Sequence, residues 1–97
     1  MKEVKNIKHI LTQHKEEIQS NFKVKELGVF GSFVRNEQRE ESDVDILVEF
    51  SEPVGMFHFL DLEEYLATLL ATKVDLVSNK ALKPFIKDYV LNEVQYV

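Results

Sequence analysis

The segment from Asp43 to Phe50, with the sequence DVDILVEF, constrains the fold more than any other part of this chain. Its β-branched and aromatic side chains are typical of a strand, in which successive side chains point to opposite faces. One face is apolar and suits a core beneath helices; it carries Val44, Ile46 and Val48. The other face carries Asp43, Asp45, Leu47 and Glu49. Because a chain of 97 residues has room for one hydrophobic core, we expect a single domain over residues 1–97.

Other segments predict helices and further strands around this one. The spacing of apolar residues and the position of a proline predict helices over residues 3–22, 56–70 and from Pro84 to about Glu93. The short segments VKELGVF and KVDLV predict strands over residues 24–30 and 73–77. The order of these elements predicts an α+β fold, an α/β mixed arrangement in which helices cover a small sheet of about three strands.

The composition excludes several classes of protein. The chain has no cysteine, so it has no disulfide framework and no cysteine-ligated zinc site. No apolar run approaches the roughly 20 residues of a membrane helix, and no apolar secretory signal opens the chain, so we expect a cytoplasmic protein without a membrane partner. The net charge of −5 argues against dedicated nucleic-acid binding. Residues 35–52, with seven acidic and two basic side chains, account for all of this charge.

Three aspartates stand at the starts of predicted strands. Asp43 and Asp45 point off one face with Cα atoms about 7 Å apart, and like charges so close destabilise each other unless a cation lies between them. Mg²⁺ is commonly held by one or two carboxylates and substrate phosphates. Asp75 is a lone acid in the apolar run KVDLV. If the two strands adjoin, the three carboxylates can hold two metals about 3.5–4 Å apart, and Asp75 can also act as a general base.

A short turn between the first two strands has the residues that a phosphate needs. Gly31 lets the backbone approach an anion closely, and Ser32 offers a hydroxyl at the start of a helical turn. Arg35 can donate charge-assisted hydrogen bonds to phosphates from the same turn. It is equally placed to pair with Glu37, with Glu49 or with one of the active-site aspartates.

The combination is more specific than its parts. Gly31-Ser32, then Asp43-x-Asp45 opening an apolar strand, then Asp75 in a later strand resembles the nucleotidyltransferase superfamily that includes DNA polymerase β. More closely, the chain resembles the minimal nucleotidyltransferase (MNT) proteins over nearly its whole length. The resemblance implies a mixed sheet and Mg²⁺-dependent transfer of a nucleoside monophosphate from a nucleoside triphosphate. It also implies that Gly31 and Ser32 bind the phosphates, that Asp43 and Asp45 bind metal, and that Asp75 is the third carboxylate.

One residue departs from the family pattern. The family commonly has glycine after the arginine of the turn, whereas this chain has Asn36 after Arg35. Asparagine tolerates the left-handed backbone conformation better than most residues. The departure from the family pattern therefore concerns the geometry of this loop and not the metal site.

MNT proteins of this size often accompany a HEPN-domain ribonuclease toxin. The resemblance thus implies an antitoxin that transfers AMP from ATP to a tyrosine of a HEPN partner, with which it can form a hetero-oligomer. Two alternatives remain open. One is a nucleotidyltransferase with a small-molecule acceptor, although such enzymes usually carry a second helical domain. The other is a non-catalytic binding subunit that neutralises its partner by forming a complex.

Overall fold

The computed structural model describes residues 3–39 and 41–97. Along the chain the elements are α1 (Val4–Gln13), α2 (Lys15–Phe22), β1 (Val24–Phe30), the 3-10 turn η1 (Gly31–Phe33), β2 (Val44–Phe50), α3 (Met56–Leu70), β3 (Val74–Ser78), the 3-10 turn η2 (Asn79–Ala81), α4 (Pro84–Glu93) and β4 (Gln95–Tyr96). The three predicted strands are confirmed to within one residue at each end.

The strands form one mixed sheet in the order β3-β2-β1-β4. β1 is antiparallel to β2 and to β4, whereas β2 and β3 are parallel and are connected through α3. The expected mixed sheet is confirmed, but the prediction of about three strands misses β4. This strand has two residues, which is too short to produce an alternating pattern in the sequence.

The single helix predicted over residues 3–22 is wrong, because the structure has two helices with His14 between them. The imidazole Nδ1 of His14 donates to the carbonyl of Ile10 at 2.9 Å. Its backbone N–H bonds instead to Leu11 at 3.2 Å, which tightens the last turn of α1. The side chain thus takes the acceptor that a continuous α-helix would give to the backbone, and a new helix begins at Lys15.

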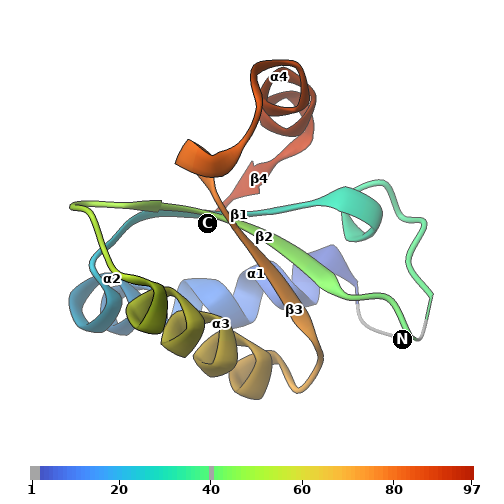
Figure 1. Cartoon of the computed structure of the whole chain (residues 1–97). Coiled ribbons are helices and arrows are strands. Elements are labelled where there is room, and N and C mark those ends of the chain that lie inside the picture. The colour runs from blue at the N-terminus through green and yellow to red at the C-terminus, as the bar shows by residue number, and fades with distance from the viewer. Residues whose placement is uncertain (1–2, 40) are drawn as a thin grey trace.

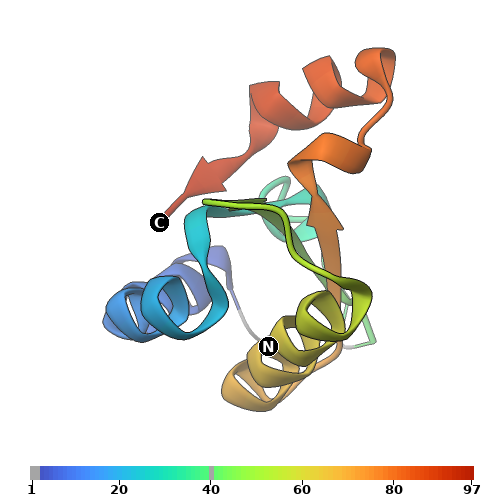
Figure 2. The same ribbon diagram turned by 60° about the vertical axis from the view of Figure 1, so that its left-hand side comes forward.

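Helices lie on both sides of the sheet (Figures 1 and 2). α1, α2 and α3 cover one face, and α4 crosses the opposite face. The predicted apolar face of β2 is confirmed, since Val44, Ile46 and Val48 are fully buried in the core under α1 to α3. On the α4 side, Leu47 of β2 and Val90 of α4 are also buried but lie outside that core. Within residues 3–39 and 41–97, no helix is long and apolar enough to cross a membrane.

Candidate active site

The parallel pairing of β2 with β3 brings two of the predicted aspartates together. Asp45 is the direct register partner of Asp75, so both side chains point to the sheet face crossed by α4. Asp43 lies immediately before β2 and is exposed, as is Asp75, whereas Asp45 is half-buried. The three predicted carboxylates therefore gather where β2 and β3 begin.

The electrostatics of Asp45 show that this position lacks sufficient positive charge. Its pKa is raised to about 6, first because the group is partly buried and then because Asp75 and Asp43 place negative charge beside it. Arg35 lowers the pKa of Asp45 but does not compensate for these effects. A bound cation would remove the repulsion, so the site is chemically suited to one.

Gly31 lies directly against the carboxylate of Asp45. The antiparallel register pairs Phe30 with Asp45, so the next residue of the chain turns under the Asp45 side chain. A Cβ atom at position 31 would collide with Asp45 Oδ2, and Gly31 has a φ of +81°. Both the close approach and the positive φ require glycine here.

The backbone after Gly31 forms the expected tight turn. Ser32 is half-buried within η1, and the carbonyl of Gly31 accepts from the N–H groups of Val34 and Arg35 at 3.1 and 3.2 Å. Asn36 has a φ of 58°, so it adopts the left-handed conformation that asparagine tolerates. The asparagine at the position where the family commonly has glycine is thus compatible with a positive φ.

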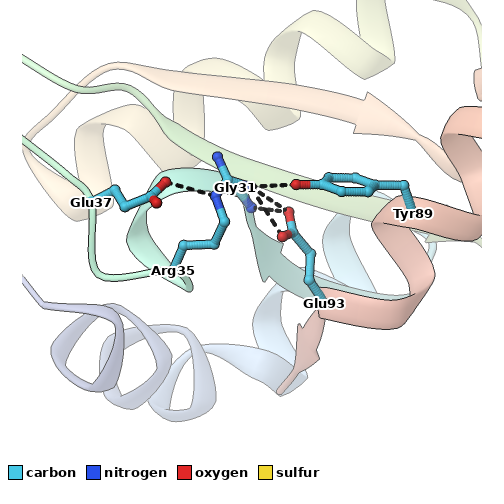
Figure 3. A network of polar contacts seen from close by, with 5 residues as sticks. All are labelled: Gly31, Arg35, Glu37, Tyr89 and Glu93. Carbon is cyan, nitrogen blue, oxygen red and sulfur yellow. Dashed lines mark hydrogen bonds and ion pairs between the residues drawn. The ribbon is translucent and has the colours of Figure 1, made fainter.

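Arg35 takes part in a network of polar contacts with three acidic or phenolic groups (Figure 3). Its Nε donates to Glu37 at 2.9 Å, and its Nη1 donates to both carboxylate oxygens of Glu93 at 3.0 Å each. Nη1 also lies 3.4 Å from the hydroxyl of Tyr89. Hydrogen bonds to Glu37 and then to Glu93 raise the pKa of Arg35 above its ordinary value. The pairing with Glu37, left open by the sequence, is therefore present.

Sequence reasoning missed Glu93. Its Oε1 accepts from the backbone N–H of Gly31 at 2.9 Å, across 62 positions of the chain. The Glu93 side chain is largely buried, with 16% of its surface exposed. No local pattern marks this residue, because it closes an ordinary helix and becomes part of the site only through the docking of α4.

A cavity lies at the opposite end of the sheet. It has a volume of about 490 Å³ and lies between the start of α3 and the carboxyl ends of β2 and β3; its lining includes Phe50, Met56, Phe59, Leu76 and Asn79. Asp45 and Asp75, in contrast, stand at the amino ends of the same strands. The candidate site is thus an open surface that its substrates would have to complete.

Comparison with known proteins decides the family. The profile of the nucleotidyltransferase domain matches residues 11–97, which include every residue of the candidate site. The chain belongs to the nucleotidyltransferase domain family. The protein adenylyltransferase MntA of Thermococcus cleftensis is 52% identical over 94 residues, which cover 97% of this chain and 95% of that protein. A protein of Methanocaldococcus jannaschii assigned as a protein adenylyltransferase is 48% identical over the full length of both chains. The predicted enzyme class, a nucleotidyltransferase, is confirmed.

Solved structures agree on the fold. A chain assigned as a minimal nucleotidyltransferase superposes with a TM-score of 0.76 at 31% identity and covers 92% of this chain and 93% of that one. An MNT antitoxin, solved with a tri-AMPylated HEPN toxin of Shewanella oneidensis, matches with a TM-score of 0.66 over 92% of this chain and 70% of that one. At 19% identity the second likeness shows the fold alone. The resemblance to MNT proteins is therefore confirmed.

Proposed function

We propose that this protein transfers AMP from ATP to a tyrosine hydroxyl of a HEPN-domain toxin and so acts as its antitoxin. The observation that carries the proposal is the pairing of Asp45 with Asp75 directly beside Gly31. This arrangement occurs in a chain that is 52% identical to a protein adenylyltransferase. The HEPN partner is supported by a fold neighbour that is an antitoxin bound to an AMPylated HEPN toxin.

Mg²⁺ fits the donor set of the site. The carboxylates are hard oxygen donors, and burial together with the negative charge of Asp75 and Asp43 raises the pKa of Asp45. In the described part of the chain, no three acidic or histidine side chains enclose a cation by themselves. Mg²⁺ does not need such a cage, because it commonly binds one or two carboxylates and the substrate phosphates. Asp43, Asp45 and Asp75 would hold one or two ions, which when bound would neutralise phosphate charge and activate the acceptor hydroxyl.

The turn that begins at Gly31 would hold the triphosphate. Gly31 lets the backbone approach the phosphates, Ser32 supplies a hydroxyl, and Arg35 supplies positive charge on the same side. A fold neighbour solved with AMP-PNP, at 22% identity and a TM-score of 0.72, supports an adenine nucleotide as the substrate.

The acceptor hydroxyl would approach from the β3 side. β3 is an edge strand of the sheet and Asp75 is exposed on it, so a partner can reach this carboxylate without displacing another element. In the reaction, the phenolic oxygen attacks the α-phosphorus, a new O–P bond forms, and the bond to the β-phosphate breaks to release pyrophosphate. Asp75 would accept the proton of the phenol.

A second candidate function has support from the surface of the molecule. Met56 and Phe57 on α3 are 69% and 84% exposed, and Phe85 on α4 is 74% exposed. Large apolar side chains on two helices are typical of a partner interface. A chain that binds a toxin tightly through these residues in a hetero-oligomer would neutralise it without catalysis. A single domain over residues 1–97 remains a prediction in either case.

The deciding experiment uses ATP labelled at the α-phosphate, Mg²⁺, this protein and a HEPN-domain toxin from the same genome. The wild type is compared with Asp43→Asn/Asp45→Asn and with the matched control Asp61→Asn/Glu64→Gln, in which the same charge is removed from exposed positions of α3. We expect the wild type and the control to label the toxin and the site variant to leave it unlabelled. Equal labelling by the site variant would contradict the mechanism. Neutralisation by all three proteins without label would favour the binding function.

A further inference from the structure

One carboxylate connects the C-terminal helix to both ends of the turn that would bind the triphosphate. Glu93 Oε1 accepts from the N–H of Gly31 at 2.9 Å and from Arg35 Nη1 at 3.0 Å, and Oε2 lies 3.0 Å from the same Arg35 nitrogen (Figure 3). Gly31 opens the turn, and Arg35 follows its last residue by two positions. A single side chain thus joins the two ends of the turn.

The position of Glu93 is itself fixed by the sheet. α4 ends at Glu93, and the chain continues directly into β4, which pairs with β1 through Gly28 and Val29. The N–H of Val97 also donates to the carbonyl of Leu27 at 2.9 Å. The strand that leads into Gly31 therefore also anchors the chain that follows Glu93.

We infer that Glu93 is a positioning residue that holds the turn from Gly31 to Arg35 in the conformation that binds the triphosphate. The inference rests on the proposed function, because it takes this turn as the phosphate site. Glycine has more backbone freedom than any other residue, so a turn that begins at Gly31 loses order readily unless a contact restrains it. Glu93 supplies that contact and also directs the guanidinium of Arg35 toward the turn. If the turn is already ordered before ATP binds, binding loses less conformational entropy and is tighter.

The same contacts also allow the opposite role for Glu93, and experiment can distinguish the two roles. A carboxylate on the N–H of Gly31 and on Arg35 occupies donors that a phosphate could use. If Glu93 competed with the nucleotide, removing it would tighten ATP binding. If Glu93 holds the turn, removing it weakens ATP binding.

The chain contains a matched control for Glu93. Like Glu93, Glu63 is a carboxylate on a helix, α3, that accepts a hydrogen bond from a backbone N–H. The donor is the N–H of Leu76, at 3.0 Å, and the contact is half-buried. Leu76 faces the core under α1 to α3, away from Gly31. Glu63→Ala therefore removes the same kind of contact elsewhere in the sheet, and Glu63→Gln removes only its charge.

The test measures the dissociation constant of ATP with Mg²⁺ by calorimetry, the kcat and KM for AMP transfer to the HEPN toxin, and thermal unfolding. We expect Glu93→Ala to weaken ATP binding by about 10- to 100-fold, the range for residues that orient the groups in direct contact with a bound ligand. KM for ATP should rise by a larger factor than kcat falls. Glu93→Gln keeps an oxygen for the Gly31 N–H and should recover much of the affinity. Glu63→Ala should lower the melting temperature and leave the ATP affinity unchanged.

Several outcomes would overturn the inference. Tighter ATP binding by Glu93→Ala would show that Glu93 competes with phosphate. Unchanged binding, or an equal loss in the Glu63 variant, would show that Glu93 contributes only to stability. If Glu93→Ala does not fold, Glu93→Gln should still bind ATP more weakly than Glu63→Gln, because its amide nitrogen cannot accept from Arg35. Equal ATP affinity of these two variants would then overturn the inference. Wild-type protein that binds ATP but labels no toxin would contradict the proposed function, while the binding series would still test Glu93.

Discussion

The two faces of the sheet are built differently. The face under α1, α2 and α3 contains a continuous apolar core, and Val44, Ile46 and Val48 of β2 are fully buried in it. The face under α4 buries Leu47 and Val90, yet it also carries Asp45 and Asp75 side by side. Neighbouring positions of one strand thus serve a core on one side and a cluster of like charges on the other.

This difference shows how a small domain can accommodate an unfavourable cluster of charges. Burial of the apolar face stabilises the fold, and repulsion around Asp45 reduces that stability without disrupting the core. Burial of Asp45, and then the negative charge of Asp75 and Asp43, raises the pKa of its carboxyl to about 6. The comparison predicts that core variants will mainly lose stability and that variants of the other face will mainly lose activity.

The largest expected effect comes from Asp45. We expect Asp45→Asn to lower the rate of AMP transfer by about 10²- to 10³-fold or more, because a charge that interacts with the reacting groups is lost. Glu49→Gln is the control, since Glu49 lies on the same face of β2 but pairs with Lys25 and Asn79. Initial rates with labelled ATP measure both variants. An equal loss in the two would mean that the whole face, rather than the aspartate cluster, supports transfer.

The next effect is on stability and compares the two faces directly. Leu66 of α3 is fully buried in the main core, so Leu66→Ala should lower the free energy of unfolding by about 2–5 kcal/mol. Val90 is buried under the other face, and Val90→Ala removes less apolar surface, with an expected loss of about 1–2 kcal/mol. Urea unfolding measures both. A larger loss for Val90→Ala would show that α4 is as central to the fold as the main core.

Gly31→Ala tests the close approach at the site. The added methyl group would meet the Asp45 carboxylate, and the positive φ of Gly31 is unfavourable for alanine. We expect a loss of stability of about 1 kcal/mol and a loss of transfer of about 10-fold or more, because Asp45 must shift. Gly55→Ala is the control, since a Cβ there meets nothing within 4 Å. If Gly31→Ala transfers AMP as fast as Gly55→Ala, the close contact between Gly31 and Asp45 is not needed for the reaction.

The smallest effect is a dependence of stability on pH. The pKa of Asp45 is raised from 3.8 to about 6, so the folded chain binds a proton more tightly than the unfolded chain does. This group therefore stabilises the fold most below pH 3.8, and that stability is lost as the pH rises to about 6. Without divalent cations, we expect Asp45→Asn to be about 1–2 kcal/mol more stable than wild type at pH 7.

Unfolding of wild type and Asp45→Asn across this pH range checks the sign. The difference between them should vanish near pH 4 and grow toward pH 7. Mg²⁺ should stabilise wild type more than Asp45→Asn. A difference in stability that is constant with pH would show that neither the burial of Asp45 nor the repulsion around it is the cause.

Local patterns predicted much of this protein. The alternation in DVDILVEF predicted β2 and its apolar face. The segments VKELGVF and KVDLV predicted β1 and β3 to within one residue. Sequence patterns did not predict the end of α1 or the strand β4, because the interactions that form them are not periodic in the sequence. A side chain bond from His14 to Ile10 ends α1, and β4 consists of two residues that pair only because β1 is already in place.

The sequence by itself determined which chemistry is present. Carboxylates at alternate positions of an apolar strand, a lone aspartate in a later strand and a glycine before a serine follow from residue type and spacing alone. Only the tertiary structure decided which of these groups meet. The parallel register places Asp45 beside Asp75, the antiparallel register brings Gly31 under Asp45, and the docking of α4 brings Glu93 to Gly31 across 62 positions. Such contacts depend on how elements pack, because residues distant in the chain leave no periodic trace of their meeting.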